Sequence, residues 1–125
     1  MNTDLFHGAH TAFSAHEGQC WTDCDEAANR YAQHSGPVAY MALDLSELTV
    51  EECEGYDYDE NSAPADSAEF RAAAAARGVD VLVYDDCDEQ GQEHTCYRLV
   101  SERAVAMARR AVILDRDEYD DLVLP

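Results

Sequence analysis

The chain has 125 residues, of which 46% are hydrophobic, and this size and composition fit one folded domain with a buried core. Its eight basic residues are all arginine and stand against 27 acidic residues, which gives a net charge of −19. A field this negative repels phosphate groups and anionic lipid headgroups, so direct nucleic-acid binding and membrane-surface binding are excluded. We expect a positively charged partner and a monomeric protein.

No apolar run approaches the ~20 residues that cross a bilayer, and the first residues lack the basic and apolar regions of a signal peptide. We therefore expect a cytosolic protein. The five cysteines are an odd number without a framework spacing, which is typical of reduced thiols in that compartment. We expect no structural disulfide.

In the first third of the chain, Leu5 to His7 suggest a short strand, followed by a loop rich in glycine, alanine and histidine. A helix is predicted after Thr22, whose hydroxyl can cap it while Asp25 and Glu26 lie at the positive end of the helix dipole. Gly36 and the proline after it end this helix. A strand is predicted over 38–43, from its length and its β-branched and aromatic content.

Residues 44–69 contain ten acids and no base, so most of this stretch reads as a long solvated loop with one turn within 46–50. Residues 67–78 predict the clearest helix: a serine cap, a run of alanine and a final glycine. Two strands over 79–84 and 95–100 form a hairpin. A short helix over 101–110, a strand over 111–114 and an acidic cluster over 115–121 follow.

These elements predict an α+β fold with two layers, a mainly antiparallel sheet and two principal helices.

Seven acids lie between Glu47 and Glu60, roughly one at every second residue. On an extended segment this places charges ~6 to 7 Å apart, about two phosphate steps along one strand of duplex DNA. Excess acid is often only a solvated surface, and acidic metal-binding loops and halophilic surfaces share the composition. Because self-repulsion costs stability, the cluster is better explained if a positively charged groove receives it. The segment therefore favours mimicry of a nucleic acid.

Three histidines and two cysteines, His7, His10, His16, Cys20 and Cys24, lie within eighteen residues and offer zinc ligands. Their spacing matches no common zinc finger, and no sequence feature marks either thiol as an activated nucleophile. We expect no metal ion and no cofactor.

The segments Leu5-Phe-His-Gly8, Gly18-Gln-Cys-Trp-Thr-Asp23 and Ala27-Ala-Asn-Arg-Tyr-Ala32 resemble, in this order, the NAD-contacting segments of ADP-ribosyltransferases. The resemblance implies that His7 binds the ribose and that Tyr31 stacks on nicotinamide. Glu93 is the nearest candidate for the catalytic glutamate, and the tyrosine of the second motif is replaced by Cys20 or Trp21. With the strands around 78–84 and 95–100, the similarity covers most of residues 4 to 105 and implies an ADP-ribosyltransferase-like fold, either intact or degenerate.

The whole chain also resembles phage anti-CRISPR proteins of the type I-C inhibitor group. That resemblance implies a small acidic inhibitor that acts in the cytoplasm of the bacterial host, mimics double-stranded DNA and blocks PAM recognition by Cascade. A type I-F inhibitor family with ADP-ribosyltransferase activity has a similar early histidine and a segment like Gly91 to Tyr97, so both hypotheses share a fold.

The favoured prediction is a non-enzymatic inhibitor whose acids contact Arg and Lys on the large, PAM-recognising subunit of type I-C Cascade. The alternative is an ADP-ribosyltransferase that inactivates a CRISPR effector subunit with NAD, using the pocket residues His7, Tyr31 and Glu93. The acids predicted to contact the partner are Glu47, Glu51, Glu52, Glu54, Asp57, Asp59, Glu60, Asp85, Asp86, Asp88, Glu89, Asp115, Asp117, Glu118, Asp120 and Asp121.

Overall fold

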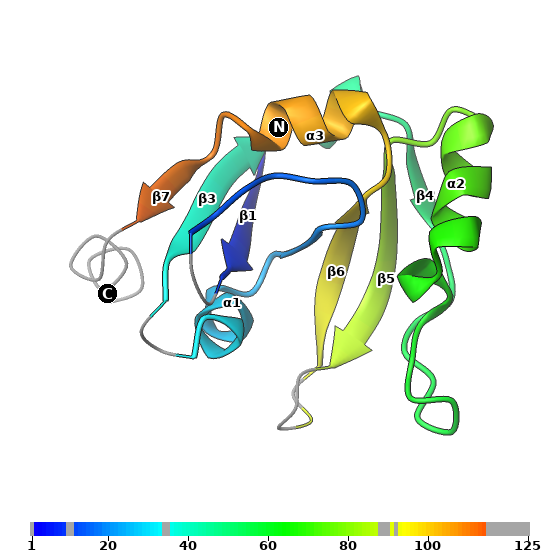
Figure 1. The fold of residues 1–125 in the computed structure, drawn as a ribbon, viewed down its shortest axis with the longest axis horizontal. Helices are drawn as coiled ribbons and strands as arrows, with labels where there is room; N and C mark the ends of the chain where they lie inside the picture. Colours follow the sequence, from blue (N-terminus) through cyan, green and yellow to red (C-terminus); the bar gives the residue numbers. More distant parts are fainter. Residues whose placement is uncertain (1, 10–11, 34–35, 88–90, 92, 115–125) are drawn as a thin grey trace.

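The computed structural model describes residues 2–9, 12–33, 36–87, 91 and 93–114. Its strands form one sheet in the order β4-β5-β6-β2-β1-β3-β7 (Figure 1). Every neighbouring pair is antiparallel except β4 and β5, which run parallel. The strands are β1 (Thr3–Gly8), β2 (Cys20–Thr22), β3 (Val38–Leu43), β4 (Val50–Glu52), β5 (Val81–Cys87), β6 (Glu93–Leu99) and β7 (Val112–Leu114).

The predicted α+β class and mainly antiparallel sheet are confirmed, whereas the arrangement of the helices differs from the prediction. The described residues form three α-helices, α1 (Asp25–Tyr31), α2 (Ala68–Ala76) and α3 (Glu102–Ala108), with two 3-10 turns, η1 (Leu45–Glu47) and η2 (Pro64–Asp66). Buried contacts place α1 and α2 against one face of the sheet and α3 against the other. The sheet is therefore covered on both faces, and a two-layer fold with two principal helices is too simple a description.

Local capping chemistry explains the helices that the sequence predicts most clearly. At the start of α2, the Ser67 hydroxyl accepts a hydrogen bond from the Phe70 backbone N–H at 3.3 Å, and Gly78 after its end has φ +90°. At the start of α3, Ser101 caps in the same way, accepting from the Ala104 N–H at 3.0 Å. Serine caps and a left-handed glycine satisfy backbone groups that a helix leaves unpaired at its ends.

The predicted cap of α1 is wrong by two residues. The residue before this helix is Cys24, whose side chain makes no capping hydrogen bond. Thr22 instead accepts a hydrogen bond from the Cys24 backbone N–H at 3.1 Å, because it ends strand β2. The helix is held by its buried alanines, Ala27 and Ala28, more than by a cap.

The acidic stretch 44–69 is more ordered than a solvated loop. Its turn, η1, overlaps only the start of the one expected within 46–50, and strand β4 follows, which pairs in parallel with β5 from the Val50–Val81 pair to the Glu52–Val83 pair. The sequence pattern hides β4 because it is an edge strand with no fully buried side chain. Its backbone ladder and an ion pair between Glu51 and Arg77 hold it, and neither leaves a hydrophobic signal.

A disulfide joins Cys20 of β2 to Cys96 of β6, with Cα atoms 6.0 Å apart, so the expectation of no structural disulfide is wrong. The two residues are 76 positions apart, and strand pairing brings them together. Cysteine number and spacing carry no information about such a long-range pairing. Cys24, Cys53 and Cys87 are free and partly buried.

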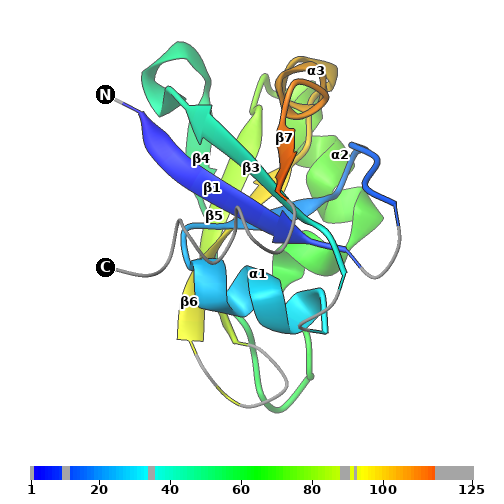
Figure 2. The same cartoon turned by 90° about the vertical axis from the view of Figure 1, so that its left-hand side faces the viewer.

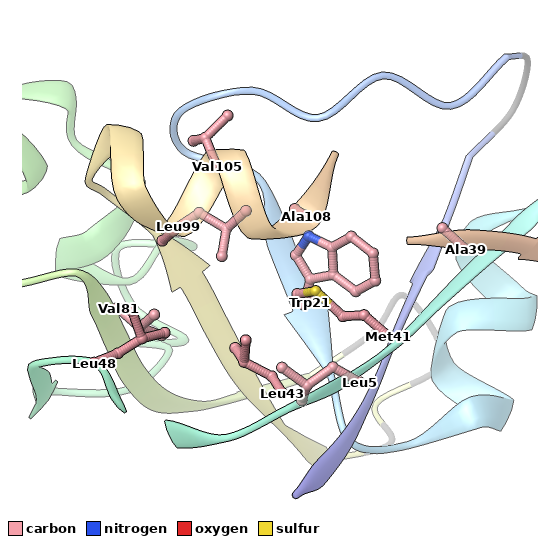
Figure 3. Packing of buried hydrophobic residues seen from close by; sticks show 11 residues of the cluster. Leu5, Trp21, Ala39, Met41, Leu43, Leu48, Val81, Leu99, Val105 and Ala108 are labelled. Atoms are coloured by element: carbon pink, nitrogen blue, oxygen red, sulfur yellow. The ribbon is translucent and has the colours of Figure 1, made fainter. Parts of the chain in front are cut away.

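The largest core cluster surrounds Trp21, which is completely buried (Figure 3). Leu5, Met41 and Leu99 pack around the indole from three different strands, and α3 closes the cluster. The indole N–H donates to the Gln19 side-chain oxygen at 2.9 Å, so the one polar atom of this ring is satisfied.

The centre of the sheet has a weak junction. Strand β2 has three residues, and its register with β1 contains one aligned pair, Phe6 with Thr22. On one side of it lie β6, β5 and β4, and on the other β1, β3 and β7 (Figures 1 and 2). In the described part of the chain no helix is long and apolar enough to span a membrane.

Candidate functional site

A pocket of about 290 Å³ opens between helix α1 and the centre of the sheet. It spans the junction between β2 and β1, because its lining residues come from β1, β2, α1, β5 and β6. Its lining residues are Phe6, His7, Gly8, Cys20, Thr22, Tyr31, Asp86 and Arg98. A pocket formed by several strands and a helix can hold a small ligand with polar groups fixed around it. We call it the α1 pocket.

His7 borders the α1 pocket at the end of β1, and its ring, which packs on the Trp21 side of the sheet, is neutral with a defined tautomer. Burial lowers the pKa of His7, and this effect exceeds the opposing one of its hydrogen bond. That bond joins Nδ1 to the Cys20 carbonyl oxygen at 2.7 Å. Because a carbonyl oxygen only accepts, Nδ1 carries the proton, and Nε2 is left as an acceptor. The ring centroid lies 5.6 Å from Trp21 and 5.9 Å from Phe13, which fixes the ring further.

Tyr31 lies at the last position of α1 and supplies the aromatic wall of the α1 pocket. It is 37% exposed, although the alanines on the same helix are buried. Its ring meets His94 edge to face, with centroids 5.8 Å apart. The helix can come this close to the sheet because Gly8 faces it: a Cβ on Gly8 would lie 2.8 Å from the Ala32 nitrogen and closer still to the Ala28 oxygen.

Arg98 brings positive charge to the pocket and is anchored by several acceptors. It donates to the Gly18 carbonyl at 2.8 Å and to the Tyr84 hydroxyl at 2.7 Å, and it forms an ion pair with Asp66. Burial raises the pKa of Tyr84 to about 12, although Arg98 opposes that rise, so this hydroxyl stays protonated. Arg98 is therefore a fixed cation at the wall of the pocket.

The structure brings together two of the three predicted pocket residues. His7 and Tyr31 both line the α1 pocket, whereas Glu93 does not. Glu93 lies at the start of β6 and lines a separate hollow of about 250 Å³, together with Gly55, Tyr56, Tyr58, Asp85, Asp86 and Cys87. We call this the β5–β6 hollow. Asp86 lines both cavities.

The predicted acidic surface is spread over several environments. Glu51 is paired with Arg77, and Asp57 accepts backbone hydrogen bonds from Asp59 and Glu60 within its own turn. Glu47 is exposed in η1, beside a different hollow next to β3 and α3. The exposed acids near the β4 edge and its following loop are Glu52, Glu54, Asp57, Asp59 and Glu60, with Asp85 on the neighbouring strand. Asp88, Glu89, Asp115, Asp117, Glu118, Asp120 and Asp121 lie outside the described residues.

The five histidines and cysteines of the early segment do not gather into one group among the residues that the structure describes. The described group of metal-ligating side chains is a different one, Cys20, Asp86 and Cys96. His10 lies outside the described residues.

Sequence reasoning missed Cys96 and Arg98, and it assigned Asp86 to the outer surface. The missing signal is the alternation along β6: His94, Cys96 and Arg98 share one face of the sheet with Cys20 and Thr22 of β2. That pattern becomes readable only once the partner strand and its register are known.

Comparisons of the chain with protein-family models, with curated proteins and with solved structures found no match.

Proposed function

We propose that the α1 pocket binds the nicotinamide riboside end of NAD and that the protein is an ADP-ribosyltransferase, with an ADP-ribosyltransferase-like fold. The observation that supports this most is that His7 and Tyr31 line the same pocket. The resemblance to ADP-ribosyltransferases implies that His7 binds the ribose and that Tyr31 stacks on nicotinamide. The two residues belong to different elements, β1 and α1, and both line this cavity.

The chemistry of the two side chains suits this ligand. With its proton on Nδ1, His7 keeps Nε2 as the acceptor available to a ribose hydroxyl at the end of β1. The partly exposed ring of Tyr31 offers a face for a flat aromatic group. At about 290 Å³ the pocket is at the small end of ligand sites, so it suits one end of a dinucleotide, with the remainder outside it.

In the transfer, the bond between ribose C1′ and the nicotinamide nitrogen breaks, and its electron pair leaves with nicotinamide. An acceptor nucleophile bonds to C1′ and loses its proton to solvent. A carboxylate near C1′ stabilises the positive charge that develops on the ribose. Asp86 is the carboxylate that lines the α1 pocket, and Glu93 lines the β5–β6 hollow behind it. We therefore assign this role to Asp86 and place Glu93 on the acceptor side.

A thermal titration with NAD tests the pocket. At a hundred times its Kd, a ligand of the folded state adds about 2.7 kcal/mol of stability, which raises Tm measurably. We expect this shift for the wild type and for Tyr58→Ala, a matched tyrosine deletion in the β5–β6 hollow, and its loss in Tyr31→Ala. No shift in the wild type, or an equal shift in Tyr31→Ala, would refute the pocket assignment.

Transfer itself is tested by mass spectrometry of CRISPR effector subunits incubated with the protein and NAD. We expect an added ADP-ribose, reduced far more by Asp86→Asn than by Glu52→Gln, a neutralisation on the β4 edge. An unmodified set of subunits after full NAD binding would leave NAD recognition standing and remove transferase activity.

A second candidate function follows from the β5–β6 hollow and the acids around it. We propose a cytoplasmic anti-CRISPR role in which this region mimics DNA and receives Arg or Lys side chains of the PAM-recognising subunit of type I-C Cascade. The supporting observation is the pairing of rings with carboxylates. Tyr56 and Tyr58 meet edge to face with centroids 5.1 Å apart beside Asp85 and Glu93, and a cation is attracted to both groups.

Two variants of equal charge separate this role from a general effect of acidity. Glu52→Gln/Glu54→Gln/Asp59→Asn neutralises three exposed acids at the predicted surface, and Asp23→Asn/Glu26→Gln/Glu69→Gln neutralises three exposed acids elsewhere. We expect the first variant to lose its competition with target DNA for Cascade, and the second to retain it, in the absence of NAD. Wild-type binding should weaken steeply with salt. Equal behaviour of the two variants would show that the acids only solvate the surface.

A further inference from the structure

The floor of the α1 pocket contains a group of metal-ligating atoms that neither proposed function uses as a set. The sulfur atoms of Cys20 and Cys96 and a carboxylate oxygen of Asp86 all lie within 4.8 Å of one another. Two of these residues, Cys20 and Asp86, line the pocket, so the group borders an open cavity. In the described part of the chain, this is the group of three metal-ligating side chains whose ligand atoms lie that close together.

Strand pairing produces this group. In the register of β2 with β6, Cys20 stands opposite Arg98 and Thr22 opposite Cys96, so both cysteines project from the same face of the sheet. In the register of β5 with β6, Tyr84 stands opposite Cys96 and Asp86 opposite His94, which places Asp86 on that face as well. Three strands therefore deliver one ligand each, and a sheet holds such positions more precisely than loops do.

We propose that, once the Cys20–Cys96 disulfide is reduced, Cys20, Cys96 and Asp86 bind one Zn²⁺ ion, with the fourth position open to the α1 pocket. Thiolate and carboxylate are both zinc ligands, and three protein ligands with one open position are the arrangement of zinc sites that act on a bound molecule. Two sulfurs at ~2.3 Å from a tetrahedral zinc lie about 3.8 Å apart, which the 6.0 Å between the two Cα atoms allows.

The disulfide and the metal are alternative states of the same sulfur pair. A dithiol or phosphine reductant supplies two electrons, and two protons are taken up as the S–S bond breaks and two thiols form. Zinc then displaces the two thiol protons, which pass to solvent, so binding is tighter at higher pH. A disulfide oxidant accepts two electrons from the two thiolates and is itself reduced to two thiols. The Cys20–Cys96 disulfide forms again, and the ion is released. The site therefore binds metal only under reducing conditions.

The surrounding charge favours an occupied site. Two thiolates and a carboxylate carry three negative charges, and one Zn²⁺ leaves a net charge of −1. Arg98 stands opposite Cys20 in the strand register and lines the same pocket. Its hydrogen bonds to Gly18 and Tyr84 hold this cation in place beside the remaining charge.

Cobalt titration of the reduced protein tests the site, because Co²⁺ reports thiolate ligands by a sulfur-to-cobalt charge-transfer band in the near ultraviolet. The background is the full chain with Cys24→Ser, Cys53→Ala and Cys87→Ser, which removes the three other thiols. We expect one Co²⁺ per chain, displacement by one Zn²⁺, and no band before reduction. Asp86→Asn should keep the band and weaken binding by at least about tenfold, since even outer partners of zinc ligands change affinity by that factor.

Three results would overturn the proposal: no band in the reduced background protein, a band that survives Cys20→Ala with Cys96→Ala, or half an ion per chain, which would mean a site shared between two copies. Circular dichroism of the reduced background protein establishes that it is folded before the titration. If reduction unfolds the chain without metal, Zn²⁺ must restore the folded spectrum in the background protein and fail to do so in the double alanine variant. The readout uses no NAD, so the proposed transferase activity stands or falls separately.

Discussion

Gly8→Ala is a one-atom test of how closely α1 lies on the sheet. The added Cβ would meet backbone atoms of two helix residues, Ala28 and Ala32, with the Ala32 nitrogen at 2.8 Å. Ordinary contact begins near 3.4 Å, and backbone cannot rotate away, so relieving the contact with the Ala32 nitrogen alone takes ~0.6 Å, and the closer Ala28 oxygen requires the helix to move farther. Tyr31 ends this helix and would move with it, which changes the shape of the α1 pocket.

The magnitude follows from overpacking. Extra carbon in a closely packed region costs about 1 to 3 kcal/mol. For a domain of this length, each kcal/mol lowers Tm by roughly 3 to 5 °C, so we expect a fall of about 3 to 15 °C. Gly78→Ala is the matched control. Gly78 has φ +90° and no atom within 4 Å of the added Cβ, so its cost of about 1 kcal/mol arises from backbone strain alone.

Urea unfolding and NAD titration of the two variants separate the causes. Both variants should be less stable than the wild type, but only Gly8→Ala should also lose the NAD-induced rise in Tm. A Gly8→Ala protein with wild-type stability would show that α1 does not lie against β1 as described. A destabilised variant with full NAD response would show that the position of α1 does not set the pocket.

Three further predictions concern single groups. Burial raises the pKa of Tyr84 to about 12, so the protonated hydroxyl contributes roughly 2 kcal/mol to the free energy of unfolding below pH 10, and this contribution is lost between pH 10 and 12. Unfolding measurements across this range should show the steeper loss of stability in the wild type and not in Tyr84→Phe. Because the pKa of His7 is lowered in the folded state, the unfolded chain takes up a proton on this ring at a higher pH than the folded chain does. The stability advantage of the wild type over His7→Gln should therefore shrink as the pH falls below about 6.5. An unchanged difference in stability between pH 7.5 and 5.5 would contradict the burial of this ring. The disulfide closes a loop of 76 residues, so its reduction should lower the free energy of unfolding by up to about 4.5 kcal/mol, measured by denaturation with and without reductant. A non-reduced peptide map that pairs Cys20 with another cysteine would refute the assignment of this disulfide.

The sequence was sufficient for the elements whose signals are local. Helix α2 follows from Ser67, its alanine run and Gly78, and the β5–β6 hairpin follows from two apolar runs around an acidic turn. The seven-residue α3 follows from Ser101 in the same way. Each of these signals involves neighbours within a few residues, which is the range over which capping and alternation act.

The remainder depended on contacts between distant residues. Strand β4 has exposed side chains and is defined by its parallel backbone pairing with β5, which no alternation marks. The disulfide and the metal-ligating group arise from the register of β2 with β6. The pocket residues were found in part, because His7 and Tyr31 belong to motifs, whereas Arg98 and Asp86 acquire their places from strand pairing alone.

The short strand β2 joins two parts of the sheet, β4-β5-β6 and β1-β3-β7, and its register with β1 contains one aligned residue pair. The disulfide links β2 to β6, while α1 packs on β1 and β3, so the residues that line the α1 pocket come from both sides of this junction. A ligand in this pocket would bridge the two parts of the sheet and stabilise the pairing of β2 with β1. Amide protons of β2 should then exchange with deuterium more slowly when the pocket is filled, while those deep in β3 and β5 change little, and the centre of the sheet becomes its most ligand-sensitive part.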